Sequence, residues 1–215
     1  MRVIIITGAG SGFSAGGDLD SLESFTNMES FEIKDTVYRY FGAGVRAVRL
    51  CRKPTIAAVN GPAVGAGCEL ALACDFRVAS TAALFRGSWI DLGLISPLGG
   101  MALLPQLVGL SKANEMLLLG HIVKGEEAAA IGLVNELVEP DRLRDAATAA
   151  AKRLAAGPPL GLDAMKEGIR RGFETALATE WEHNVYVQGM LIDSADYAEG
   201  VAAIQEKRRP TFRGA

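Results

Sequence analysis

The sequence predicts an α/β core over residues 1–139, followed by a helical region over residues 140–215. Short β-branched runs that end at glycine turns indicate strands in the first half, and a helical apolar period between them indicates crossover helices. From about residue 111 onward the helical pattern dominates. With 215 residues, 49% of them hydrophobic, the chain can bury a sizeable core in one large domain or two small ones.

Four short and nearly apolar runs are the predicted strands, at residues 3–7, 55–60, 76–79 and 133–138. Between the first two strands, one face of a predicted helix carries Val37, Phe41, Val45 and Val48. After Pro140, the helical spacing continues through Leu143, Ala147, Ala150 and Leu154. The apolar positions expected in the terminal helices, residues 176–204, are Trp181, Val185, Met190 and Ile192.

Charge and cysteine usage exclude several classes of protein. The formal net charge is −3, so no broad basic surface points to nucleic acid. Two long uncharged stretches, residues 54–68 and 92–111, are too short or too interrupted by glycine and proline for a membrane span. No secretory signal is recognised, so the expected location is cytoplasmic. Three cysteines and two histidines without a CxxC pair predict neither a disulfide framework nor a metal site.

A first glycine turn, Thr7-Gly8-Ala9-Gly10-Ser11-Gly12, follows the first predicted strand. Alone it resembles the phosphate loop of a dinucleotide-binding fold. The third glycine of that pattern would fall on Phe13, and the following Gly16-Gly17 pair does not favour the opening of a helix. A nicotinamide dehydrogenase is therefore the weaker interpretation of this turn.

A second glycine turn, residues 60–69, runs into the small apolar segment 70–74. A helix is predicted to begin near Gly65, and its first N–H groups have no partner within the helix, so they can bind an anionic oxygen. Glu69 lies three residues after Ala66, on the same face of the first turn. It is either an acid or base beside that oxygen or a glutamate favoured only by the helix dipole.

Taken together, the two turns closely resemble the paired signature of the crotonase, or enoyl-CoA hydratase/isomerase, family. The segments that carry this resemblance are residues 13–19 and 60–75, and further landmarks in family order are 92–97 with Gly99-Gly100, 128–134, 198–203, 206–208 and Pro210. The resemblance implies a crotonase-like spiral of ββα units, N-terminally short, with a trimerisation region at residues 140–215. It also implies an acyl-CoA substrate, no separate cofactor, and a homotrimer or hexamer.

By this resemblance, the backbone N–H groups of Gly17 and Ala66 would hold the thioester oxygen and stabilise an enolate. Glu69 aligns with the first catalytic glutamate of the hydratases and is expected to act as the general base. Asp18 and Leu19 would line the coenzyme A groove. The basic cluster Lys207-Arg208-Arg209 is either a phosphate contact or a solvated tail.

Trp89 stands where the hydratase pattern has its second glutamate. Trp89 is expected to line the substrate pocket or to be a core aromatic. If the segment is extended, Asp91 shares a face with Trp89 and is the candidate second catalytic residue; otherwise it is an exposed loop acid. A single carboxylate suits isomerisation or decarboxylation better than hydration. The expected function is a hydratase or isomerase, with a catalytically silent acyl-CoA-binding subunit as the alternative. The acyl pocket, or ordinary core, would be formed by Phe25, Met28, Phe31 and Trp89.

Overall fold

A four-stranded parallel sheet forms the centre of the fold. The computed structural model describes residues 1–25 and 28–213; within its helices, the side chains of residues 19, 21, 30, 173–180 and 182–184 lie outside the description. The strand order is β1-β2-β4-β7, comprising β1 (Ile4–Thr7), β2 (Thr55–Val59), β4 (Phe76–Ser80) and β7 (Glu136–Val138). Three of the four predicted strands are confirmed almost residue for residue.

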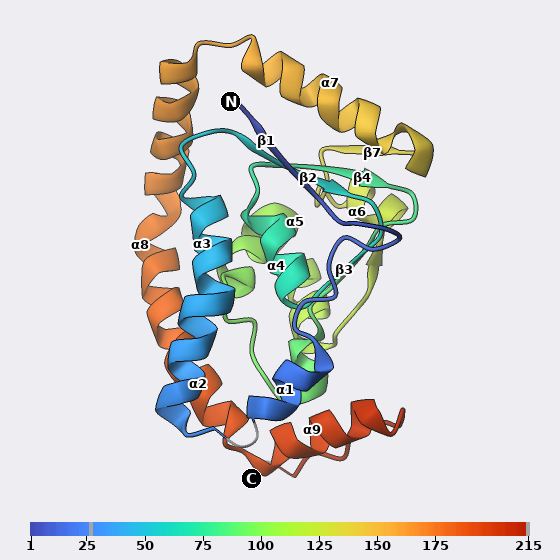
Figure 1. Ribbon diagram of the computed structural model, residues 1–215, viewed down its shortest axis with the longest axis vertical. Helices are drawn as coiled ribbons and strands as arrows, with labels where there is room; N and C mark the ends of the chain where they lie inside the picture. The colour runs from blue at the N-terminus through green and yellow to red at the C-terminus, as the bar shows by residue number, and fades with distance from the viewer. Residues whose placement is uncertain (26–27, 214–215) are drawn as a thin grey trace.

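Both faces of this sheet are covered by helices (Figure 1). On β2, Ile56 and Ala58 pack with α7 (Leu143–Ala155), while Ala57 and Val59 face α4 (Ala66–Ala73) and α5 (Gly100–Leu118). All five residues of β2 are buried. This double burial explains why the strand reads as a continuous apolar run rather than an alternating one.

The fourth predicted strand, residues 133–138, is shorter in the structure. Gly132 has φ +76° after α6 (Gly125–Ala130), and the N–H groups of Leu133 and Val134 donate back to Ala128 O. These two residues therefore close the helix rather than pair with β4. The strand begins only at Glu136.

A second, three-stranded sheet holds the turn that follows β2. Its order is β3-β5-β6, comprising β3 (Pro62–Val64), β5 (Leu84–Arg86) and β6 (Val123–Lys124), with β3 and β5 parallel. Gly65 N donates to Arg86 O at 2.9 Å. The start of α4 is thus fixed against the end of β5, from which the 3₁₀ helix η2 (Ser88–Leu92) follows.

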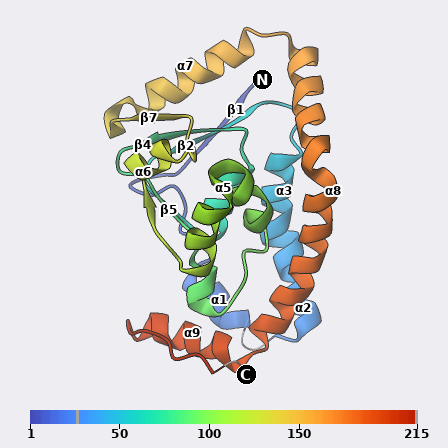
Figure 2. The same cartoon turned by 180° about the vertical axis from the view of Figure 1, so that it is seen from behind.

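The helix predicted between the first two strands is part of a longer helical rod. It comprises α2 (Ser30–Thr36), the π-helix η1 (Val37–Gly42) and α3 (Ala43–Arg49). Its neighbour is the 34-residue helix α8 (Pro159–Ile192), which runs along one side of the molecule in both views (Figures 1 and 2). The remaining helices are α1 (Leu19–Phe25), η3 (Pro140–Arg142) and α9 (Ala195–Gln205).

Most of the expected apolar positions of the terminal helices are buried. Trp181, Val185 and Ile192 face the core, whereas Met190 is 74% exposed. Met190 lies two residues from Ile192, about 200° around the helix axis, so both cannot face the core. Met190 is therefore an apolar side chain on the outer side of α8. The division of the chain at residue 140 stays a prediction.

The cysteines behave as small buried hydrophobes. Cys68 and Cys74 are buried, and Cys51 is half-buried. Burial raises the pKa of the Cys68 and Cys74 thiols to about 12, so both stay protonated at neutral pH. The described residues contain no cluster of metal-ligating side chains and no helix long and apolar enough to cross a bilayer.

Candidate active site

The two glycine turns are joined by backbone hydrogen bonds. Ser14 N donates to Pro62 O at 3.1 Å, and Val64 N donates to Ser14 O at 2.9 Å. The approach depends on glycine in the second turn: a Cβ at Gly67 would lie 2.5 Å from Ser14 O, and one at Gly61 would lie 1.9 Å from Ser11 O. The sequence therefore brings residues some 50 positions apart into one site.

Backbone groups in the first glycine turn are hydrogen-bonded to the side chain of Asn60 and do not form a phosphate-binding loop. Asn60 Oδ1 accepts from Gly8 N at 3.1 Å, and Asn60 Nδ2 donates to Gly10 O at 3.0 Å and Gly12 O at 3.1 Å. No helix begins within this turn; the next one starts at Leu19. This geometry argues against the nucleotide-loop interpretation.

Gly17 and Ala66 line a common cavity of about 950 Å³. Gly65, with φ +53°, turns the chain into α4, and Ala66 is the first residue of that helix. The N–H group of Ala66 therefore has no carbonyl partner within the helix. The neighbouring Gly16, with φ +89°, packs so close to the second turn that a Cβ there would lie 3.1 Å from Ala66 N. Among the described residues, neither Gly17 N nor Ala66 N has an acceptor. Two residues whose N–H groups are available to a ligand therefore line one cavity.

Glu69 is buried and is connected to the cavity through Trp89, which lines the cavity and donates to its carboxylate. Its side chain comes from the first turn of α4 and is 2% exposed. Oε1 accepts from Ser96 Oγ at 2.7 Å and from the N–H groups of Leu98 and Gly100 at 2.9 Å each, while Oε2 accepts from Trp89 Nε1 at 2.9 Å. Burial raises the pKa of Glu69 to about 7, against the lowering effect of the four donors.

The three donors to Glu69 Oε1, from Ser96, Leu98 and Gly100, are not predicted by the sequence analysis. There, Ser96 and the Gly99-Gly100 pair are only landmarks of the family resemblance. A Cβ at Gly100 would lie 2.1 Å from Ser96 Oγ and 3.0 Å from Glu69 Oε1. The glycine pair is therefore the sequence signal that could have revealed this close approach of main chain to carboxylate.

Trp89 is half-buried and lines the cavity with its ring. Asp91 lines the same cavity as Trp89. The condition set for a shared face, an extended segment, is not met, because the segment is a 3₁₀ helix. Successive side chains of a 3₁₀ helix are about 120° apart, and positions two apart share no face. Asp91 Oδ2 is ion-paired with Arg86 Nη2 at 2.7 Å. Glu69 and Asp91 share no hydrogen bond in the described structure.

The other expected contacts lie at different places around the cavity. Asp18, Arg208 and Arg209 line it, and the side chain of Leu19 lies outside the description. Arg208 is held by Glu199, with Nη1 and Nη2 donating at 2.5 and 2.8 Å, and this pairing lowers the pKa of Glu199 to about 2. The second half of the chain thus contributes cationic side chains to the cavity.

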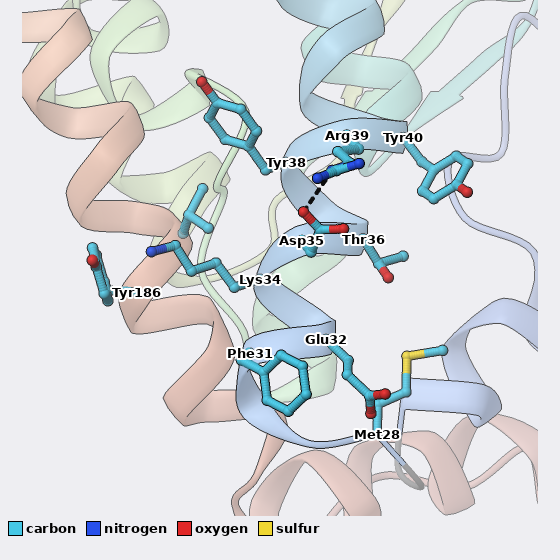
Figure 3. Close-up of a pocket in the computed structure, with 11 residues that line it drawn as sticks. Met28, Phe31, Glu32, Lys34, Asp35, Thr36, Tyr38, Arg39, Tyr40 and Tyr186 are labelled. Atoms are coloured by element: carbon cyan, nitrogen blue, oxygen red, sulfur yellow. Dashed lines mark hydrogen bonds and ion pairs between the residues drawn. The ribbon is translucent and has the colours of Figure 1, made fainter.

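A separate hollow lies on the outer face of α2, η1 and α8 (Figure 3). Lys34 Nζ lies over the ring of Tyr186, 3.7 Å from its centroid. Arg39 Nε forms an ion pair with Asp35 Oδ1 at 2.6 Å. Met28 and Phe31 line this hollow, with Phe31 71% exposed. Neither residue lines the cavity at Gly17 and Ala66, whereas Phe25 and Trp89 line a small chamber beside Gly17.

A spiral α/β fold in which two joined glycine turns present main-chain N–H donors beside a buried carboxylate defines an enzyme site of the crotonase class. The family model for enoyl-CoA hydratase/isomerase matches residues 1–215. The 1,2-epoxyphenylacetyl-CoA isomerase of Escherichia coli (strain K12) is 36% identical over 214 residues, which cover 100% of this chain and 82% of that protein. The crotonyl-CoA hydratase of Syntrophomonas wolfei is 34% identical, over 99% of this chain and 80% of that protein.

The fold agrees with solved structures. The crystal structure of an enoyl-CoA hydratase/isomerase from Pseudoalteromonas atlantica T6c superposes with a TM-score of 0.86 at 32% identity, covering 99% of this chain and 82% of that one. The chain belongs to the enoyl-CoA hydratase/isomerase family. It is an enzyme of acyl-CoA thioesters, of the hydratase or isomerase type.

Proposed function

We propose that this enzyme is an isomerase that moves the double bond of an unsaturated acyl-CoA by proton transfer. The observation that carries the proposal is the hydrogen bond from Trp89 Nε1 to Glu69 Oε2, at 2.9 Å. An indole stands where the hydratase pattern has its second carboxylate. One carboxylate can remove a proton from one carbon and return it to another, whereas hydration as the hydratases run it uses two.

The N–H groups of Gly17 and Ala66 are the proposed donors to the thioester oxygen. Removal of a proton from the carbon next to the thioester places negative charge on that oxygen, and donors aimed at it stabilise the enolate. Losing one such donor typically costs about 2.7–4 kcal/mol of transition-state stabilisation. Both N–H groups lack an acceptor among the described residues and both residues line one cavity, which supports this assignment.

Glu69 Oε2 is the proposed proton carrier. Oε1 already accepts three hydrogen bonds, whereas Oε2 accepts one, so the proton would reside on Oε2. A pKa of about 7 suits a group that must gain and lose a proton at neutral pH. The carboxylate is 2% exposed, and its partner Trp89 lines the cavity, so in this proposal the substrate carbon reaches Oε2 beside the indole.

Asp91 is the residue on which the hydratase alternative depends. It lines the cavity but is held by Arg86. For hydration, Asp91 would supply the second proton, and the Asp91→Asn variant would then lose most of its activity. For isomerisation through Glu69 alone, Asp91→Asn keeps its activity.

Asp18, Leu19 and the arginines of the C-terminal cluster are the proposed coenzyme A contacts. Arg208 and Arg209 line the cavity, and their cationic groups suit the phosphates of the coenzyme. A salt-dependent rise in KM in Arg209→Ala, with kcat unchanged, would support that contact.

The experiment follows the double bond and the exchangeable proton separately. A 3-enoyl-CoA and crotonyl-CoA are incubated in heavy water, with isomerisation and hydration read from the conjugated thioester absorbance and deuterium incorporation read by mass spectrometry. We expect isomerisation, abolished in Glu69→Gln and retained in the matched carboxylate control Asp91→Asn, with the deuterium content of the product reporting how far Glu69 exchanges its proton with solvent before returning it. Tight acyl-CoA binding with neither isomerisation nor deuterium incorporation would instead identify a silent binding subunit.

We infer that the enzyme assembles into trimers or paired trimers. Four apolar side chains exposed on α8 support this: Leu160, Met165, Ile169 and Met190, each more than 60% accessible. Three of them, Met165, Ile169 and Met190, lie within about 60° of one another around the helix axis, and exposed apolar side chains of this kind are typical of a protein interface. Light scattering should give a mass at least three times that of one chain, and a monomer at micromolar concentration would contradict it.

A further inference from the structure

A small inner chamber adjoins the main cavity. Gly17, Leu22 and Trp89 line both spaces, so the chamber begins at one of the two proposed oxyanion donors. Its volume is about 20 Å³, enough for one or two non-hydrogen atoms. The walls are almost entirely apolar, formed by Phe25, Phe41, Trp89, Leu94, Leu98 and Ile192.

One polar side chain breaks this apolar lining. Gln188 projects from α8, is 1% exposed and lines the chamber. Its Oε1 accepts from Ile95 N at 3.3 Å, which fixes the amide so that Nε2 is its free end. In the part of the chain that the structure describes, Nε2 has no acceptor. Nε2 is not among the fully enclosed side-chain atoms that lack a partner, so it keeps accessible surface, and Gln188 lines the chamber. A donor that faces an apolar space without an acceptor is a site for one.

The other polar group in the lining is already engaged. Trp89 donates its N–H to Glu69 Oε2, so Gln188 is the only side chain among the described lining residues with a donor to offer. A buried water usually makes about three hydrogen bonds, more than this lining supplies through its side chains. A ligand atom needs only one, because the rest of the ligand holds it in place.

The ligand atom that fits is an uncharged oxygen. Nε2 is a donor, so its partner is an acceptor. No cationic side chain is among the described residues that line the chamber, and burying a carboxylate against one neutral amide would leave its charge uncompensated. A ketone, ester or ether oxygen meets both conditions.

We propose that the chamber is a specificity subsite in which Gln188 Nε2 donates a hydrogen bond to an uncharged oxygen near the distal end of a short acyl group. The placement rests on the proposed function, because it takes the thioester oxygen to lie at Gly17 and Ala66. The remaining acyl carbons then pass Trp89 to reach the chamber. The substrate class is a short, distally oxygenated acyl-CoA.

The test compares matched thioesters that cannot react. Pentanoyl-, hexanoyl- and heptanoyl-CoA are each titrated by calorimetry beside the analogue that carries a ketone on the penultimate carbon. At one chain length we expect the ketone to bind about tenfold more tightly, the effect of satisfying one buried donor. Equal or weaker binding of the ketone at all three lengths overturns the proposal, whatever any variant does.

Two variants assign the effect to the amide. Gln188→Met keeps the length of the side chain but removes the donor, and it should reduce the ketone preference to within about twofold. Gln205→Met makes the same change on the neighbouring helix α9, outside both cavities, and should keep the preference. A preference that survives Gln188→Met would overturn the proposal. Because these ligands report binding alone, a ketone preference in an enzyme that fails to isomerise a 3-enoyl-CoA would reject the proposed reaction while leaving the subsite standing.

Discussion

Replacing Trp89 by phenylalanine should move the pH dependence of proton transfer toward higher pH. The change keeps an aromatic ring in the cavity wall and removes the N–H that Glu69 Oε2 accepts. That hydrogen bond favours the charged carboxylate, so its loss raises the pKa of Glu69 above about 7.

The size of the shift follows from the hydrogen bond that is lost. A hydrogen bond to a charged group contributes about 1.5–3 kcal/mol, and one pKa unit corresponds to about 1.36 kcal/mol. The midpoint of the ionisation in kcat/KM should therefore rise by about one to two pH units. At pH 7 the ionised fraction would fall about five- to fiftyfold, and activity would recover as the pH is raised.

The assay is kcat/KM for isomerisation of a 3-enoyl-CoA from pH 5.5 to 10. Trp181→Phe is the matched control, because Trp181 is buried and its Nε1 has no hydrogen-bond partner among the described residues; its profile should equal that of the wild type. An unshifted or lowered midpoint in Trp89→Phe would refute the reasoning. Either the indole does not stabilise the carboxylate or Glu69 is not the group that titrates.

Three further predictions concern the same site. Between pH 4.5 and 7 the folded state binds more protons at Glu69 than the unfolded state, so stability falls as pH rises through this window; Glu69→Gln should remove on the order of 3 kcal/mol of that dependence, measured by thermal unfolding across the window. Gly67→Ala should lower stability by about 1–3 kcal/mol and abolish turnover, because its Cβ meets Ser14, whereas Gly44→Ala, in open space on α3, should raise stability by about 0.5–1 kcal/mol. Trp89→Glu should raise hydration of crotonyl-CoA by about a hundredfold or more over the wild type, and an unchanged rate would show that the second carboxylate is not what the wild type lacks.

The elements that sequence reasoning predicted best are those with strong local signals. Residues 55–60 form an unbroken apolar run that a buried parallel strand requires, and β2 occupies five of these six positions. Gly65 marked the start of α4 because small residues precede a helix-forming segment, and the helix begins at Ala66. Both features depend on neighbours in sequence, so the local pattern was sufficient.

The parts that could not be predicted depend on tertiary contacts. The donors to Glu69 Oε1 come from a turn about 30 residues away, and Gln188 reaches the inner chamber from α8. The Gly99-Gly100 pair is the one sequence signal for the first contact, and no periodicity or motif signals the second. The sequence left open whether the segment at Asp91 is extended, and the structure forms a 3₁₀ helix there that ends at Gly93, with φ +69°.

The indole of Trp89 changes the pKa of Glu69 as well as the number of acidic groups in the site. Two carboxylates at positions 69 and 89 would each raise the pKa of the other, because like charges disfavour ionisation. Trp89 reverses the sign of this interaction, since its N–H stabilises the charge on Glu69. A buried carboxylate that remains partly ionised near pH 7 without a neighbouring acid is suited to accept and return one proton. In the proposed isomerisation, the indole at position 89 would therefore both take the place of the second acid and adjust the pKa of Glu69 to a reaction that needs one proton carrier.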